Sequence, residues 1–288
     1  MGSTLTNKEK DWDLVIEPVS SSMQALRISQ IWKYRDLISL FVHRDFVAVY
    51  KQTILGPIWF FLQPILTTII FTVVFGTAAK LSTDGLPKPV FYMSGIVLWN
   101  YFSEVLLKSS ETFIAYRYIF AKVYFPRLVV PISIVFSNML KLGVQLILFF
   151  AVYLYYCITT DLIEPTWHLL LIPLLIVPIA LMGMGCGLLV AALTVKFRDL
   201  KFMVNFAVDL LKYVSPIIFP LSMIDGTLQT LILLNPMSAI IETFRVLCFG
   251  QGEFEWIYLA SSLGMTFVLL AVGLFYFAKA EKTFIDTV

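Results

Sequence analysis

Charged residues are scarce in this sequence. They make up 14% of its 288 residues, whereas hydrophobic residues make up 59% and the mean hydropathy is +0.86. A water-soluble core of ordinary shape cannot hold so much apolar surface. The composition therefore excludes an ordinary soluble protein and indicates a polytopic membrane protein. A formal net charge of only +2 does not favour a nucleic-acid partner.

The sequence also lacks the residue patterns of common catalytic and metal sites. Its three cysteines, Cys157, Cys186 and Cys248, lie far apart without CxxC spacing, which argues against a disulfide framework or a metal site. Its two histidines, His43 and His168, fall on opposite sides in the topology predicted below, and there is no nucleophile elbow. No GxxxxGK[ST] phosphate loop occurs. We therefore predict that the chain is not an enzyme and that any ATP is hydrolysed by another chain.

The stretch Arg44–Pro64, RDFVAVYKQTILGPIWFFLQP, joins a charged amphipathic segment directly to an uncharged hydrophobic one. Between Ile38 and Val49 the apolar residues share one stripe of a helix, with charged residues opposite. Such a helix lies along a bilayer surface, and we expect a protein neighbour as well, either another helix or a partner subunit. Gly56 and Pro57 predict an elbow, because proline is tolerated in the first turn of a new helix.

Six segments are predicted to cross the membrane: residues 54–79, 90–114, 132–156, 169–195, 202–219 and 257–278. Two apolar stretches before the last span, 228–234 and 237–249, are each too short to cross, so we expect short re-entrant helices there. The sequence thus predicts an all-α polytopic membrane protein. Its parts are a cytoplasmic lead (1–30), an amphipathic interface helix (31–53), a six-span domain (54–280) and a cytoplasmic tail (281–288).

Basic residues indicate the orientation. No hydrophobic run of signal-peptide type precedes the first span, so the N-terminus is expected inside. With that choice, most of the 21 lysines and arginines fall in inner segments, and the outer segments hold only Lys80, Lys88 and Arg245. Both termini are therefore predicted to be cytoplasmic.

Five charged residues fall within predicted spans, where an unpaired charge is costly and marks a functional candidate. Glu104 and Lys108 lie one helical turn apart, and Asp209 lies near Lys212. In each case the two charges could form a local ion pair with no other role, or they could be part of a substrate path. Lys141 has no local partner, but it is close enough to the inner end of its span to extend its amino group towards the surface.

Small and aromatic residues are common in the predicted spans. Gly183, Gly185 and Gly187 favour close approach of another helix over a ligand site. Most aromatic residues are expected at the membrane interface or facing lipid. The alternative is a carbohydrate path, because sugar rings stack on aromatic planes. The candidates for such a path are Trp59, Phe60, Tyr92, Trp99, Tyr213 and Phe219.

Four motifs follow one another in order: RDFVAVYKQTILGPIWFFLQP, then FPRLVVP after the second span, SPIIFP ending the fifth, and NPMSAIIETFR before the sixth. Together they resemble the permease subunits of type-2 ABC exporters for polysaccharides, from about Trp12 to the C-terminus. WDLVIEP and YKQTILGPIWFFLQP look most like the O-antigen exporters of lipopolysaccharide biosynthesis, with capsule and teichoic acid exporters next.

This resemblance implies the permease subunit of an ATP-driven exporter. The substrate would be a polysaccharide linked to undecaprenyl pyrophosphate, moved across the bacterial inner membrane. The resemblance also implies a homodimer bound by two copies of a cytoplasmic ABC ATPase, which would hold ATP and Mg, so that this chain itself carries no cofactor. As a hypothesis, closure of the ATPase pair tilts the first span through the Gly56–Pro57 elbow and opens the channel.

The resemblance further implies roles for particular residues. The surface that couples to the ATPase would include Arg35, Arg44, Asp45, Lys51, Arg117, Lys122, Phe125 and Arg127. An outer gate would correspond to residues 228–249, with Asn235, Pro236, Glu242 and Arg245. The channel wall between two subunits would include Trp59, Phe60, Tyr213 and Phe219.

Three other functions remain open. An exporter of small lipids or drugs would share the fold and differ only in cargo. A membrane glycosyl or acyl transferase would be active without any ATPase, although the sequence shows no catalytic constellation for it. A purely structural assembly protein would neither need nor stimulate ATP hydrolysis.

Overall fold

The computed structural model describes residues 28–51, 56–160, 162–163, 167–224, 226–250 and 255–285. Most of the predicted lead, residues 52–55 before the elbow and the last residues of the tail lie outside these ranges. Within them every regular element is a helix. The predicted all-α polytopic class is therefore confirmed.

Five helical stretches are long and apolar enough to cross a membrane. The first runs through the 3₁₀ helix η1 (Gly56–Ile58), α3 (Trp59–Phe71) and the π-helix η2 (Thr72–Ala78). The others are α4 (Lys88–Ser110), α7 (Val129–Thr159), η3 (Trp167–Leu171) with α8 (Ile172–Thr194), and α12 (Trp256–Ile285). These stretches correspond to the first four predicted spans and the sixth.

The fifth predicted span is shorter than expected. Helix α9 (Leu200–Val214) has 15 residues, which is about 22 Å at about 1.5 Å per residue, whereas the hydrocarbon layer is about 30 Å thick. The helix ends there because Pro216 and Pro220 cannot donate backbone hydrogen bonds, and residues 215–220 are not helical.

The short helices before the last span are present. After η4 (Leu221–Met223), helices α10 (Thr227–Leu233) and α11 (Pro236–Phe249) meet at an angle of 90°. They are a broken span or a re-entrant loop, so the described residues hold five candidate spans, or six if this bent pair is one.

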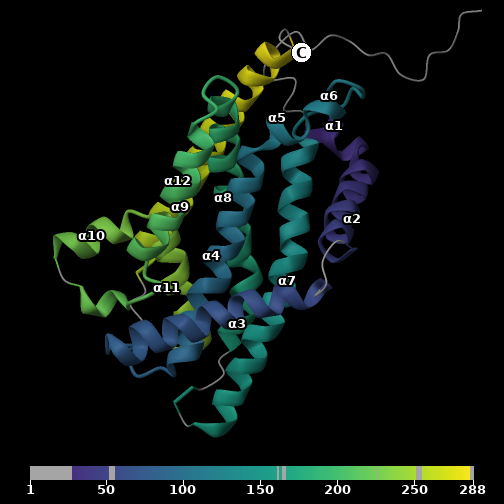
Figure 1. The fold of residues 1–288 in the computed structure, drawn as a ribbon. Helices are drawn as coiled ribbons and strands as arrows, with labels where there is room; N and C mark the ends of the chain where they lie inside the picture. The colour runs from purple at the N-terminus through teal and green to yellow at the C-terminus, as the bar shows by residue number, and fades with distance from the viewer. Residues whose placement is uncertain are drawn as a thin grey trace, which may run out of the picture.

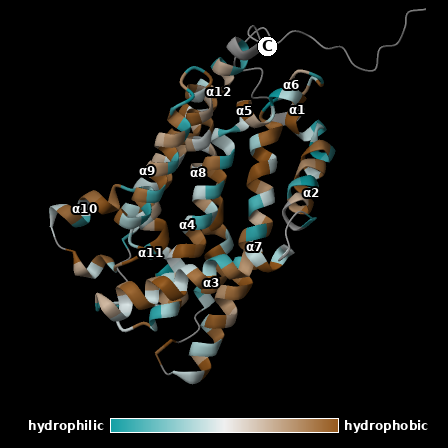
Figure 2. Cartoon of the chain, in the orientation of Figure 1, coloured by the Kyte–Doolittle hydropathy of each residue, from teal (hydrophilic) through white to brown (hydrophobic). Residues whose placement is uncertain are grey.

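Helix α8 lies at the centre of the bundle. It packs against α4 on one side and α12 on the other, and α7 packs against α4 (Figure 1). Helix α4 contributes much of the core, because nearly all its residues from Val90 to Leu106 are buried. Hydrophobic residues run along α7, α8 and α12, whereas hydrophilic ones gather in the turn before α9 (Figure 2).

Glycines on α8 allow this close packing. A Cβ atom on Gly185 would lie 2.7 Å from the Leu270 Cα atom of α12, and one on Gly187 would lie 2.7 Å from the Leu106 carbonyl oxygen of α4. Backbone atoms cannot move aside as a flexible side chain can. The packing interpretation of the glycine pattern is therefore confirmed.

We expect Gly185→Ala to lower the melting temperature of the purified chain by several degrees, because its methyl group would push α8 and α12 apart. Gly143→Ala on α7 is the matched control, since a Cβ atom there meets nothing within 4 Å. Thermal unfolding of both variants in the same lipid nanodiscs makes the comparison. Equal melting temperatures would contradict the packing argument.

The two ends of the bundle differ in which segments they gather. At one end lie α1 (Ile28–Lys33), α5 (Thr112–Ala115), α6 (Arg117–Phe120) and the C-terminal end of α12 (Figure 1). At this end Lys201 pairs with Glu111 at 2.8 Å, and the rings of Phe113 and Phe277 stack at 4.7 Å. Every described segment predicted to be cytoplasmic therefore shares one end, while the assignment of that end to the cytoplasm stays a prediction.

Candidate coupling surface, span charges and gate

Helix α2 (Arg35–Lys51) packs against the first half of α7 (Figure 1). Its stripe residue Phe41 is buried among Phe125, Val129, Val130 and Ile134. The protein neighbour predicted for this amphipathic helix is therefore α7. Leu40, on the opposite side, is exposed. The position of α2 relative to a bilayer surface stays a prediction.

Arg44 joins the two segments predicted to couple to an ATPase. Its guanidinium group lies 2.6 Å from the Asp45 carboxylate and donates a hydrogen bond of 2.7 Å to the Tyr116 hydroxyl. It also lies 4.9 Å from the ring centroid of Phe41 and 5.0 Å from that of Tyr116. Burial raises the pKa of Tyr116, and Asp45 adds to this effect, so the hydroxyl stays neutral. We call Arg44, Asp45, Phe41 and Tyr116 the Arg44 clamp.

The other predicted coupling residues differ in how far their side chains are buried. Four are exposed: Arg35, Arg117 and Lys122 near the end of the bundle that holds α1 and α6 (Figure 1), and Lys51 at the far end of α2, next to the elbow. Phe125 is buried against Phe41, with ring centroids 6.0 Å apart. These placements keep the exposed basic residues available for contact with a partner, and that contact stays a prediction.

Arg127 is buried and ties the loop before α7 to the end of α12. It donates a hydrogen bond of 3.0 Å to the Glu281 carbonyl oxygen, and its Nε atom lies 4.0 Å from the Glu281 carboxylate. Its guanidinium carbon lies 5.3 Å from the ring centroid of Phe120. Burial lowers the pKa of Arg127, and Glu281 partly offsets this. Arg127 thus anchors the loop internally.

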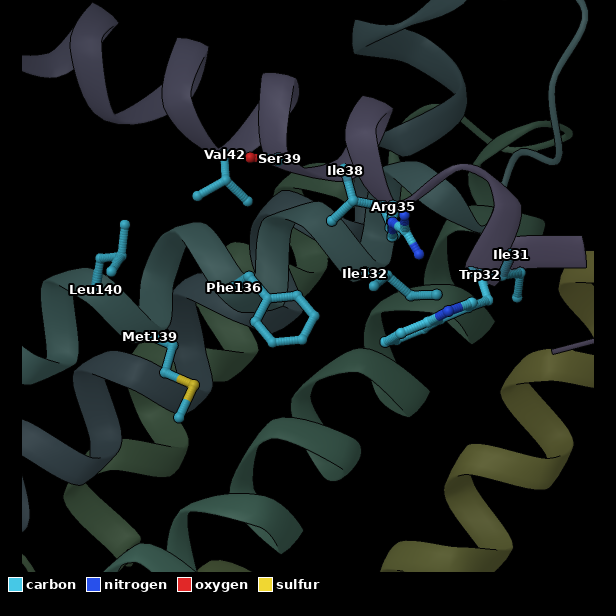
Figure 3. A pocket seen from close by; sticks show the side chains of 10 residues that line it. All are labelled: Ile31, Trp32, Arg35, Ile38, Ser39, Val42, Ile132, Phe136, Met139 and Leu140. Atoms are coloured by element: carbon cyan, nitrogen blue, oxygen red, sulfur yellow. The ribbon is translucent and has the colours of Figure 1, made fainter. Parts of the chain in front are cut away.

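An apolar groove of about 510 Å³ lies between α1 and α2 on one side and the outward face of α7 on the other (Figure 3). Trp32 and Val42 line one wall, and Phe136 and Met139 line the other. Arg35 is the one charged residue along it. The groove shows that α2 covers only part of the apolar surface of α7.

The elbow begins a helix, as the sequence predicts. Gly56 is buried with a φ of 52°, a left-handed conformation that favours glycine, and it starts η1. Pro57 follows in the first turn and is exposed. Phe60, one turn later, lies 6.2 Å from the ring of Phe46 on α2. The elbow therefore holds α2 and α3 in contact, and its motion during transport stays a prediction.

The charges of the second and third spans form one cluster. Lys108 lies 3.4 Å from the Glu104 carboxylate and donates a hydrogen bond of 2.8 Å to Asn138. Lys141 pairs with the other oxygen of Glu104 and lies over the Phe60 ring. The expected Glu104–Lys108 pair is thus present. Lys141 has a partner that local sequence does not show, because that partner is on α4.

The other two charges of the predicted spans are not paired with each other. Asp209 is exposed on α9, and no ion pair joins it to Lys212 in the described part of the chain. Lys212 instead lies 5.0 Å from the ring centroid of Phe71 on α3. Of the two local pairs considered from the sequence, only that of Glu104 is formed.

Two predicted gate residues form a buried ion pair. Arg245 and Glu242 are 2.8 Å apart, with side chains 2% and 5% exposed. Arg245 also lies 3.8 Å from the ring centroid of Phe91 and reaches Ser94 and the Ile217 carbonyl oxygen at 3.3 and 3.5 Å. Arg245 is therefore buried inside the bundle, where Glu242 and Phe91 stabilise the cation, and the position of its segment on the outer side stays a prediction.

The other two gate residues begin α11. Asn235 caps the helix by accepting a hydrogen bond from the Met237 backbone N–H at 3.1 Å, and Pro236 occupies the first turn. The Asn235 amide also donates to the Ser215 hydroxyl at 2.9 Å. These contacts bind α11 to the non-helical segment 215–220. A gating role for them stays a prediction.

The predicted path residues are divided between surface and core. Trp59 and Tyr213 are exposed, and Phe219 is half-buried. Phe60, Tyr92 and Trp99 are buried within the protomer. A wall between two subunits needs exposed side chains, and of the predicted wall residues Phe60 does not meet that requirement in this structure. Their part in a substrate path stays a prediction.

The profile of the family described as ABC-2 type transporter matches residues 36–249, which run from α2 to the end of α11. The chain belongs to the ABC-2 type transporter family. The match includes the Arg44 clamp, the Glu104 cluster and the Glu242–Arg245 pair. With its apolar helices, this ABC-2 chain is a multi-pass membrane protein.

Individual ABC-2 relatives are similar over most of their length. The O-antigen export system permease protein RfbA of Myxococcus xanthus is 26% identical over 263 residues, covering 91% of this chain and 98% of the relative. A Klebsiella pneumoniae protein of the same name is 27% identical over 254 residues, covering 87% and 94%. The polysialic acid transport protein KpsM of Escherichia coli is 24% identical over 242 residues, covering 81% and 89%.

Sequence reasoning missed the partners that complete these clusters. Tyr116, Glu281 and Ser94 come from elements far along the chain, so no local spacing pointed to them. Asn138 did leave a signal, because it lies three residues before Lys141 on the same face of α7.

Proposed function

We propose that this ABC-2 chain is the permease subunit of an ATP-driven exporter of a lipid-linked polysaccharide in the bacterial inner membrane. The observation that carries the proposal is the similarity, over nearly their whole length, to two permeases named for O-antigen export. The weaker similarity to a polysialic acid transport protein supports polysaccharide as the class of cargo. O-antigen on undecaprenyl pyrophosphate is the first candidate, with capsular polysaccharide and teichoic acid as alternatives.

A separate ATPase is part of this proposal. The sequence has no phosphate-binding loop, and exposed Arg35, Arg117 and Lys122 lie near one end of the bundle, where charged residues could hold a cytoplasmic partner. Exposed Lys51 lies at the far end of α2, next to the elbow. Two copies of this chain, each with one ATPase subunit, would place a path between them wide enough for a polymer. A symmetric dimer is the simplest such assembly.

The Arg44 clamp suggests how ATP closure reaches the membrane helices. It links α2 to the loop that holds Tyr116, while Phe41 packs on α7 and Arg127 reaches α12. A push on this end would therefore move α2, α7 and α12 together. Residues 52–55 connect α2 to the Gly56 elbow, so the same push would reach α3.

Deletion of the gene for this chain tests the proposal. We expect loss of surface polysaccharide and accumulation of lipid-linked glycan on the cytoplasmic side, both restored by the wild-type chain. Surface glycan can be followed by gel electrophoresis, and the lipid-linked form by mass spectrometry of membrane extracts. Normal surface glycan with sensitivity to toxic small molecules would instead favour an exporter of small lipids or drugs.

A further inference from the structure

The cluster of Glu104, Lys108, Asn138 and Lys141 contains two lysines and one carboxylate, so it has an excess of one positive charge. Glu104 is the one carboxylate that pairs with either lysine in the described part of the chain. Both lysines come from helices long and apolar enough to cross a membrane. An excess cation on such helices is costly unless it meets an anion, which makes it a functional candidate.

The two lysines have different surroundings. Lys141 is 17% exposed, pairs with Glu104 and lies 5.4 Å from the ring centroid of Phe60, so it neutralises the carboxylate from within. The Lys108 side chain is 51% exposed, and its Nζ atom lies 3.4 Å from the Oε2 atom of the same carboxylate. The excess charge is therefore presented at the surface by Lys108.

The Lys108 ammonium group is held in place before any ligand arrives. Asn138 is buried, and its amide nitrogen donates to the Ile134 carbonyl oxygen at 2.7 Å. This bond turns the amide oxygen of Asn138 towards Lys108, and the Lys108 ammonium group donates a hydrogen bond of 2.8 Å to that oxygen. With Glu104 on a second side, two acceptors fix an ammonium group that has three N–H donors. One donor is left to point outward.

Lys108 lies near the end of a candidate span, at the depth in a membrane where lipid headgroups are expected. It lies two residues before the end of α4, and one turn further Glu111 pairs with Lys201 at the start of α9. Helix α4 packs against both α7 and α9 (Figure 1). A helix end of a candidate span is where phosphate groups of membrane lipids reside, and a cation fixed there is a point charge suited to phosphate.

We propose that Lys108, held by Glu104 and Asn138 and backed by Lys141, binds the phosphate group of a lipid. The site does not require the export function proposed above. The choice of undecaprenyl pyrophosphate as the first probe does rest on that function, because its pyrophosphate would then meet this cluster near the α3 elbow. An ordinary anionic phospholipid offers the same chemistry.

The test is lipid binding by the purified full-length chain, measured by native mass spectrometry with undecaprenyl pyrophosphate as probe. Lys108→Gln is expected to weaken binding about tenfold, and Lys108→Arg to retain it, because arginine keeps the charge. Asn138→Asp is expected to weaken binding as well, although Lys108 is intact, because the added carboxylate neutralises the cluster. Lys196→Gln removes an exposed cation at the same end and is the matched control, expected to bind as wild type.

Three further probes identify the source of the phosphate. Competition by phosphatidylglycerol would support a site for ordinary phospholipid. Selectivity for undecaprenyl pyrophosphate would support a substrate site. Competition by inorganic pyrophosphate would support recognition of the headgroup alone. Undecaprenol has the same tail without phosphate, and equal affinity for it would overturn the proposal. So would wild-type binding by Lys108→Gln and Asn138→Asp, or an equal loss in Lys196→Gln. Deletion of the gene tests export separately, so either idea can fail alone.

Discussion

Replacing Arg245 by methionine is expected to destabilise the chain by about 3–5 kcal/mol, the range for removing one partner of a buried ion pair. Glu242 would lose its partner at 2.8 Å, and Phe91 would lose the cation 3.8 Å from its ring centroid. Segment 215–220 would also lose its contact through the Ile217 carbonyl oxygen. The free energy of unfolding in a denaturing detergent titration measures the effect.

A second variant separates the buried charge from lost packing. Arg245→Met combined with Glu242→Met removes both charges, so we expect it to be more stable than Arg245→Met alone. Arg35→Met is the surface control, because Arg35 is exposed and its nearest carboxylate contact is 3.8 Å. If Arg245→Met were no less stable than Arg35→Met, the buried pair would not stabilise the fold.

The second large effect concerns coupling through the Arg44 clamp. With the partner ATPase bound, we expect Arg44→Ala to lower glycan-stimulated ATP hydrolysis about tenfold. A hydrogen bond to a charged group contributes about 1.5–3 kcal/mol, and about 1.4 kcal/mol corresponds to a factor of ten. The Arg44 bond to the Tyr116 hydroxyl, at 2.7 Å, is a charged link between α2 and the turn that joins α5 to α6. Steady-state ATPase assays with and without glycan measure the change.

Two variants show whether the link itself matters. Tyr116→Phe keeps the ring beside Arg44 and removes only the hydroxyl, so an intermediate loss of stimulation is expected. Arg198→Ala removes an exposed arginine at the same end of the chain and is the matched control. If Arg198→Ala reduced stimulation as much as Arg44→Ala, general charge would explain the effect and the clamp would not.

The long helices could be predicted from the sequence because their signal is local. An uncharged run such as 54–79 must leave water, and η1, α3 and η2 follow that run to within a few residues. The end of α9 was harder to place. Its prolines are visible in SPIIFP and predict a break at Ser215–Pro216, where the helix does end, although the hydrophobicity of the segment continues past them to Phe219.

The clusters could be predicted only in part, because their partners come from distant segments. The Glu104–Lys108 spacing gave one pair, whereas the Lys141–Glu104 contact needs α4 and α7 to pack together. Arg245 has a local signal in Glu242, three residues earlier, but charge counting over segments cannot distinguish a buried arginine from an exposed one. Burial of Tyr92 and Trp99 likewise depends on which face of α4 meets α8.

Coupled polysaccharide export is tested most directly by the ATPase activity of this chain co-purified with its candidate ABC partner in lipid nanodiscs, with and without a lipid-linked glycan. We expect the partner to co-purify, the glycan to stimulate hydrolysis, and Arg44→Ala to remove most of the stimulation. A basal rate indifferent to glycan but raised by small lipids would contradict polysaccharide export. The absence of any co-purifying ATPase would contradict ABC coupling itself.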